Sequence, residues 1–286
     1  MVNGLLTGGV YALVALGLTL IYGVLHIVNF AHGSLLMLAM FGTWLLCTEA
    51  GFDPYAALPV MVAAMFAMGW ALYRGVIGPV AAGAGGGVRQ DRAILLATLG
   101  VAVVLDNFAL VLFTGDTRTI DTPYAFDVVP VGGMLISLPR LISFGVALLL
   151  ALALWAFMTR TDAGRAIRAV AREPDGARLM GIRPERIFAL AYGIGIACLG
   201  AAACLLLPVF YVSPSVGNSF VLVSFTIVVL GGMGSFPGAV IGGLLIGVTE
   251  SLGGLLLGES LGPIGISTVF IAVLLLRPTG LFGAAR

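Results

Sequence analysis

The chain has no lysine and few charges of any kind. All 14 of its cationic side chains are arginine, and charged residues make up 9% of its 286 positions, against about 25% in an ordinary soluble domain. Without lysine, the chain cannot supply the phosphate-binding lysine of a P-loop nucleotide site. Any work that the protein does with ATP must therefore come from another subunit.

Cysteine and histidine are also scarce, with three and two residues. The cysteines lie in apolar segments, and their spacing indicates neither a disulfide framework nor a metal site. The histidines lie six residues apart without a nearby carboxylate, which is not a metal-ligand set. Since no Ser-His-Asp or Cys-His combination is evident either, we expect no catalytic residues, no cofactor and no bound metal.

Hydrophobic residues, in contrast, account for 60% of the chain, which indicates an integral membrane protein. A bilayer is crossed by about 20 apolar residues in a helix, and the backbone must satisfy its own hydrogen bonds there. The apolar runs predict an all-α, polytopic protein with about eight or nine membrane segments, some of them broken or re-entrant half-helices. We expect one transmembrane domain over residues 1–286. The runs cover residues 4–24, 32–47, 55–73, 93–113, 141–158, 187–210, 220–248 and 264–276.

Seven of the 14 arginines lie in one polar segment, residues 159–186, which reads TRTDAGRAIRAVAREPDGARLMGIRPER. Acidic residues are interleaved with them, which favours a folded loop over a nucleic-acid-binding tail. Moving seven arginines across a bilayer is disfavoured, so this loop is predicted to be cytoplasmic. Counting spans backwards places the loop at residues 114–140 outside.

Within the arginine-rich loop, Pro174 after Glu173 marks the start of a short helix, and Gly181 marks its end. The apolar face of this helix could enter a groove on a soluble partner. The alternative is an ordinary cytoplasmic loop whose helix lies on lipid headgroups. The candidate partner-binding residues are Arg172, Glu173, Pro174, Asp175, Ala177, Met180, Gly181 and Ile182.

Polar residues interrupt the apolar pattern near the N-terminus, in the segment YGVLHIVNFAHGS. Asn29, His32 and Ser34 are predicted to line a substrate pathway, because an irregular backbone at membrane depth is tolerated beside a cavity or inside protein. The alternative is a plain turn between two spans, in which Asn29 or His32 caps the following helix.

Glycines interrupt a second apolar run, in the segment GGMGSFPGAVIGG. Gly231, Gly232, Gly234 and Ser235 are predicted to break the helix and to expose backbone polar groups to a cavity. The glycines from Gly238 onward recur at the four-residue spacing that lets helices pack closely. Two interrupted helices, one towards each end of the chain, are typical of a pathway at the membrane midplane.

Asp106 lies inside the run 93–113. An acid within a membrane span is a functional candidate, here as the ion-coupling residue of a secondary transporter. The alternative is that Asp106 is solvated or bonded to a neighbouring helix.

The chain closely resembles the permease subunits of branched-chain amino acid ABC importers, the LivH-type inner-membrane family. The resemblance covers nearly the whole chain, and it rests on four segments in the family's order: YALVALGLTLIYGVLHIVNFAHGSLLMLAMF, AREPDGARLMGI, VVLGGMGSFPGAVIGGLLIG and RPTGLFG.

This resemblance implies a multi-pass permease of the bacterial inner (plasma) membrane, in contact with membrane lipid and with no nucleic-acid partner. The implied partners are a second homologous permease, two cytoplasmic ATP-binding-cassette ATPase subunits and an extracytoplasmic substrate-binding protein. The segment AREPDGARLMGI would be the coupling helix that docks on the ATPase. The implied substrate is a branched-chain amino acid, although permeases that resemble this family also carry urea or short amides.

Overall fold

The computed structural model of the chain describes residues 1–85, 87–131, 134–258, 262–277 and 280–282, and these are mostly helical, as predicted. In chain order the helices are α1 (Val2–Leu25), α2 (His32–Glu49), α3 (Leu58–Leu72), the π-helical turn η1 (Tyr73–Ile77), α4 (Gly78–Gly83), α5 (Gly87–Phe113), α6 (Leu138–Arg160), α7 (Asp162–Arg172), α8 (Pro174–Leu179), α9 (Pro184–Leu206), α10 (Val216–Gly231), α11 (Phe236–Leu257) and α12 (Gly262–Leu276). Strands β1 (Val128–Val131) and β2 (Met134–Ser137) pair antiparallel, with Val128 opposite Ser137.

Within the described residues, six helical segments are long and apolar enough to cross a membrane. They are Val2–Leu25, Leu58–Gly83, Gly87–Phe113, Leu138–Arg160, Pro184–Leu206 and Phe236–Leu256. Together with the shorter helices α2, α10 and α12, they agree with the predicted number of segments. The run at 220–248 does divide into two helices, α10 and α11, as its glycines predicted.

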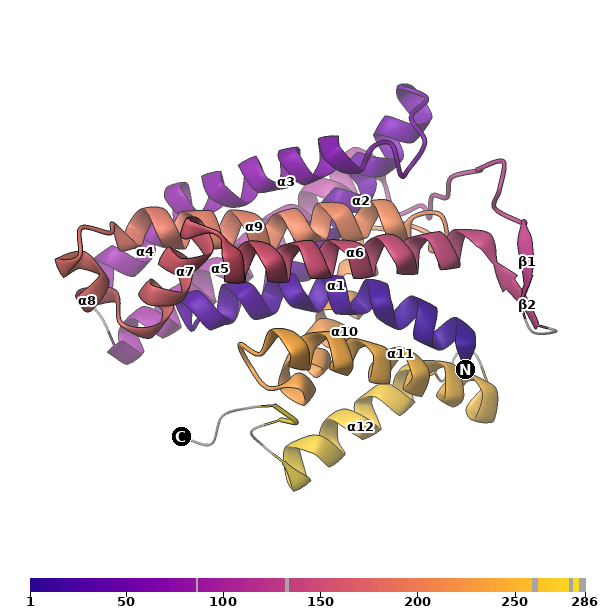
Figure 1. The fold of residues 1–286 in the computed structure, drawn as a ribbon. Helices are drawn as coiled ribbons and strands as arrows, with labels where there is room; N and C mark the ends of the chain where they lie inside the picture. The colour runs from indigo at the N-terminus through magenta and orange to yellow at the C-terminus, as the bar shows by residue number, and fades with distance from the viewer. Residues whose placement is uncertain (86, 132–133, 259–261, 278–279, 283–286) are drawn as a thin grey trace.

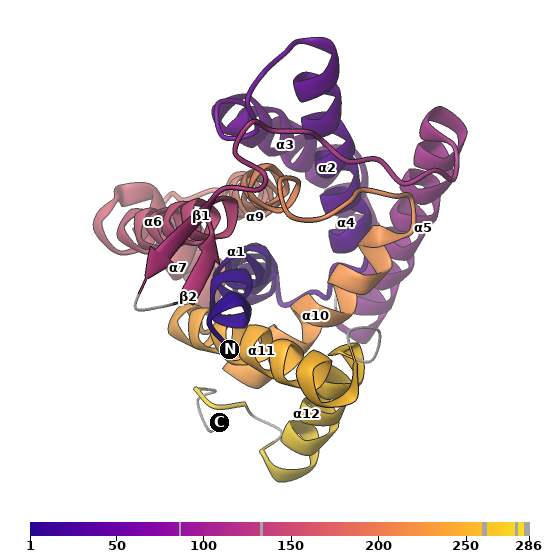
Figure 2. The ribbon, with the colours of Figure 1, turned by 90° about the vertical axis from the view of Figure 1, so that its right-hand side faces the viewer.

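The bundle has two distinct ends (Figure 1). The β1–β2 hairpin and the start of α1 lie at one end, here called the hairpin end. Helices α7 and α8 lie at the other, here called the arginine end. Viewed from the hairpin end, α1 lies in the middle of the bundle, with α6, α9, α10 and α11 around it (Figure 2). Most side chains of α1 are buried on all sides, so it is the core helix of the fold.

The third membrane segment is longer than predicted, because it continues past Tyr73 to Gly83. A charged residue, Arg74, and a proline, Pro79, lie within this extension, although either type commonly ends a membrane helix. The guanidinium of Arg74 lies over the ring of Trp70, 4.3 Å from its centre. Pro79 follows the wide π-helical turn η1, which adapts the backbone to a residue without an N–H donor.

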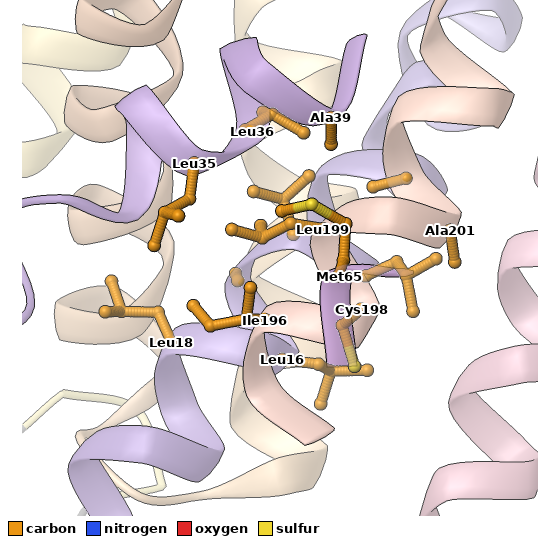
Figure 3. Packing of buried hydrophobic residues seen from close by; sticks show 14 of the residues in the cluster. Leu16, Leu18, Leu35, Leu36, Ala39, Met65, Ile196, Cys198, Leu199 and Ala201 are labelled. Carbon is orange, nitrogen blue, oxygen red and sulfur yellow. The ribbon is translucent and has the colours of Figure 1, made fainter. Parts of the chain in front are cut away.

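A cluster of apolar side chains joins the middle parts of α1, α2, α3 and α9 (Figure 3). Leu16 of α1, Leu35 of α2 and Ile196 of α9 have no exposed surface, and Met65 of α3 is almost fully buried. Leucine and lipid are equally apolar, so this cluster stabilises the bundle through close packing and not through exclusion of water.

Glycines bring α1 into backbone contact with its neighbours. A Cβ atom at Gly195 of α9 would lie 2.7 Å from the carbonyl oxygen of Gly17, and one at Gly8 would lie 2.7 Å from the carbonyl oxygen of Gly243 in α11. These distances are too short for any larger residue. The glycines from Gly238 onward therefore pack helices together, as their four-residue spacing predicted.

We expect Gly243→Val to destabilise the bundle by about 1–3 kcal/mol, because the added side chain would overpack the α1–α11 contact. A Cβ at Gly243 would lie 2.6 Å from Cα of Ala12. Thermal unfolding of the purified protein in detergent, followed by tryptophan fluorescence, measures the effect. The control is Gly145→Val in α6, where an added Cβ meets nothing within 4 Å. Equal midpoints for the two variants would contradict the contact.

Candidate functional site

The first interruption lies halfway along the bundle. Nε2 of His32, the first residue of α2, is 3.0 Å from the carbonyl oxygen of Val14. Val14 is at the middle of α1, so α2 begins at that depth and not at the arginine end, where α1 stops. The segment between Leu25 and His32 therefore runs back along the bundle without helical structure.

The polar residues of this interruption are enclosed. Asn29 and His32 have no exposed surface, and Ser34 is 5% exposed. Oδ1 of Asn29 accepts a hydrogen bond of 3.1 Å from the backbone N–H of Ala31, while its Nδ2 has no hydrogen-bond partner among the described residues. Asn29, His32 and Ser34 thus lie together inside the protein and do not face open space, so their place in a pathway stays a prediction.

The second interruption lies at Gly232 to Ser235, between α10 and α11. Gly232 and Gly234 have positive φ angles of 92° and 85°, which favour glycine. The hydroxyl of Ser235 caps α11 by accepting a hydrogen bond of 3.2 Å from the N–H of Gly238. The glycines therefore end one helix, and the serine starts the next.

The expectation that this second break exposes backbone polar groups to a cavity is wrong for the carbonyl of Gly231, and elsewhere in the break it stays a prediction. The carbonyl oxygens of Leu230 and Gly231 accept hydrogen bonds from the N–H groups of Leu281 and Phe282, at 2.8 and 3.2 Å. The chain after α12 returns to cover the end of α10, which leaves these groups satisfied. Within the RPTGLFG segment, residues 278, 279 and 283 lie outside the described part of the chain.

The structure does not bring the two interruptions together. A Cβ at Gly23 would lie 3.3 Å from Cα of Gly234, so the second break lies beside the end of α1. The first break contacts Val14. Gly23 is nine positions after Val14 on the same helix, which corresponds to about 14 Å along the bundle. Only the first break lies at mid-depth, and the second lies near the arginine end.

The arginine-rich segment forms two helices, and the sequence prediction missed the first, α7. The hydroxyl of Thr161 caps it by accepting a hydrogen bond of 3.0 Å from the N–H of Gly164. Ile167 and Val170 have no exposed surface, and α7 contacts α6, α1 and α9. The signal was present, because Ile167 and Val170 are spaced three apart among arginines and so share one helical face.

Helix α8 follows directly and agrees with the predicted short helix. It starts at Pro174, and Gly181, with a φ of 81°, ends it. Ala177 is buried, but Leu179 and Met180 are 90% and 82% exposed. Two large apolar side chains at the tip of a polar segment form a surface that a second protein can cover. We call this pair the α8 tip.

The orientation of α8 is supported by ion pairs. Arg178 donates to Glu185 at 2.7 Å, which joins α8 to the first turn of α9, and to Asp175 at 3.3 Å. These exposed pairs contribute little to stability. Of the other predicted contact residues, Arg172, Glu173 and Asp175 are exposed, and Ile182 is half-buried.

A cavity of about 340 Å³ lies between the second interruption and α7. Gly234 and Ser235 line one wall, Arg168 and Ile167 line another, and Thr19 of α1 contributes as well. The candidate pathway residues of the second break are therefore neighbours of the arginine-rich segment, which the sequence did not indicate.

Asp106 lies on a sparsely covered side of α5. Its neighbours Val103 and Val104 are largely exposed, and Asp106 itself is half-exposed. The side-chain amide of Asn107 donates to the carbonyl oxygen of Val103 at 2.8 Å. Among the described residues, Asp106 forms no ion pair. In the same part of the chain, no group of three His, Cys, Asp or Glu residues is placed to hold a metal ion.

Comparison with known proteins identifies the family. Residues 1–277 match the family described as branched-chain amino acid transport system, permease component. The chain is 33% identical to the high-affinity branched-chain amino acid transport system permease protein BraD of Pseudomonas aeruginosa, over 99% of this chain and 94% of that protein. The permease protein LivH of Escherichia coli K12 gives the same identity and coverage.

Among solved structures, PsaBC from Streptococcus pneumoniae in complex with Fab is similar, with a TM-score of 0.49 at 15% identity, over 98% of this chain and 92% of that one. The family assignment does not depend on this distant likeness. The curated relatives are transport permeases by name, and the match to them extends over nearly the whole chain. The protein therefore belongs to the family of permease components of branched-chain amino acid transport systems.

Proposed function

We propose that this chain is the permease subunit of an ATP-binding-cassette importer in a bacterial inner membrane, and that it passes branched-chain amino acids delivered by an extracytoplasmic binding protein. The family supports the substrate class. The absence of lysine supports the assignment of transport and ATP hydrolysis to different subunits, because this chain cannot form a P-loop nucleotide site. The complete importer contains a second permease and two such subunits.

The exposure of the α8 tip is the main observation that supports this proposal. Leu179 and Met180 are 90% and 82% exposed, and they lie on the segment with the most arginines. An apolar anchor surrounded by charges is typical of a helix that enters a groove on another protein. The arginines hold this end of the bundle in the cytoplasm, where an ATPase is available.

The way in which α7 is packed explains how a motion at the α8 tip would reach the membrane. Ile167 and Val170 attach α7 to the bundle, and α7 lines the same cavity as Ser235. Displacement of α8 by the ATPase would therefore move α7 and press on the α10–α11 connection. In this proposal, the enclosed residues Asn29, His32 and Ser34 become accessible when the bundle opens.

We expect Leu179→Asp to weaken ATPase binding about tenfold or more, because a carboxylate would replace an apolar anchor in the groove. Copurification of the ATPase subunits with the tagged permease measures this. Leu135→Asp is the matched control, since Leu135 is 72% exposed at the hairpin end. Leu135→Asp should retain the ATPase.

A crosslink tests the same contact directly. A cysteine introduced by Glu173→Cys at the start of α8 should crosslink to the ATPase in the intact complex. If no crosslink forms and Leu179→Asp retains the ATPase fully, the coupling assignment is wrong.

The proposed substrate pathway can be tested by measuring which of its residues water can reach while the transporter hydrolyses ATP. Asn29→Cys should react with a water-soluble thiol reagent faster during ATP hydrolysis than at rest, because Asn29 has no exposed surface in this conformation. Ser235→Cys should react in both states, because Ser235 already lines the 340 Å³ cavity. Mass spectrometry of the labelled chain measures the rates. The native Cys204, which is also fully buried, serves as the internal control and should stay unlabelled. Labelling by a lipid-soluble reagent alone would remove both residues from the pathway.

Asp106 separates an ATP-driven importer from an ion-coupled carrier. We expect Asp106→Asn to retain ATP-dependent leucine uptake in proteoliposomes, because Asp106 lies on the half-exposed side of α5, on a different element from the pathway residues. Uptake driven by a proton or sodium gradient in the wild-type chain, and lost in this variant, would establish the carrier instead.

A further inference from the structure

A second cavity, of about 360 Å³, lies between α1, α10, α11 and α12, four helices that are neighbours in Figure 2. Its volume falls within the range of about 300–1,000 Å³ that is typical of small-molecule sites. The sequence did not indicate it, because the residues that line it come from four distant segments. They include Tyr11, Phe210, Ser219, Phe220, Glu250 and Phe270.

Aromatic rings form one side of this cavity. Tyr11 meets Phe220 edge to face, with ring centres 5.9 Å apart, and Phe210 lies 6.0 Å from Phe220 and 6.4 Å from Tyr11. Three rings in mutual contact make a rigid apolar wall, which suits a branched aliphatic side chain. Their faces also attract an organic cation.

A single carboxylate, that of Glu250, completes the cavity. Glu250 is half-buried on α11 and accepts a hydrogen bond from the hydroxyl of Tyr11. A carboxylate inside a membrane protein is costly unless it has a cationic partner, and within the described residues no arginine forms an ion pair with it. Arg140, whose charge also acts on Tyr11, lines a different cavity, with Leu6 and Val10.

We propose that this cavity, the Glu250 cavity, binds the amino acid during transport, with the α-ammonium group on Glu250 and the aliphatic side chain against the aromatic wall. An ammonium–carboxylate contact is a charge-assisted hydrogen bond, stronger than a neutral one. The proposal rests on the proposed function and sharpens its substrate class. The carboxylate selects a substrate that carries an ammonium group, which urea and simple amides lack.

Protection of a cysteine introduced by Ser219→Cys tests the site in the intact transporter complex. Ser219 is exposed on the rim of the Glu250 cavity, so a thiol there should react rapidly with a maleimide in the absence of ligand. L-Leucine and L-leucine methyl ester, which both carry the ammonium group, should slow the reaction. 4-Methylpentanoate, which has the same aliphatic chain without the ammonium, should require about tenfold more for equal protection.

The Glu250→Gln variant, made in the same Ser219→Cys chain, removes the charge but keeps the shape. Half-protection by leucine should then need about tenfold more ligand, and the preference for leucine over 4-methylpentanoate should disappear. Glu49→Gln is the matched control, because Glu49 is exposed at the end of α2, and it should behave as the parent. An unchanged labelling rate without ligand shows that each variant is folded.

Two outcomes would overturn the site. One is equal protection by leucine in the Glu250→Gln variant and its parent. The other is loss of the second permease from the Glu250→Gln complex, which would assign the carboxylate to a contact between subunits. Both are distinct from failure of the proposed function, since that would appear as absence of ATP-dependent leucine uptake by the wild-type complex.

Discussion

Direct contact between helix backbones at glycine is the constraint on which this structure depends. In lipid there is no hydrophobic driving force that brings two apolar helices together, so their association depends on close packing. Gly17 and Gly195 join α1 to α9, and Gly8 and Gly243 join α1 to α11. Because these contacts place α1 at the centre, every other feature, including the polar interruption beside Val14, is positioned with respect to it.

The two interruptions have different physical roles. The first places Asn29 and His32 in the interior at mid-depth, where protein surrounds the irregular backbone and makes it tolerable. The second is a turn at the arginine end, where the returning C-terminal segment satisfies the freed carbonyl of Gly231. Since Ser235 and Arg168 line one cavity, a movement of α7 would also change the space around this turn.

The arginine end and the Glu250 cavity together outline how such a protein would work. In the proposed mechanism, Leu179 and Met180 are the anchor for the ATPase, and α7 connects that anchor to the bundle. Glu250 lies on α11, and α11 begins at the turn that lines one cavity together with α7. In this mechanism, a displacement at the arginine end would act on the start of α11, and the amino acid would be bound by Glu250 near the other end of the same helix.

Local pattern was enough for much of this protein. Apolar runs located the membrane helices, glycines divided α10 from α11, and Pro174 with Gly181 bounded α8, because each signal acts through its own stretch of backbone. Only tertiary structure decided which segments meet. The depth of His32, the separation of the two interruptions, the docking of α7 and the placing of Glu250 beside Tyr11 arise from contacts between residues far apart in the chain, and no local pattern encodes those distances.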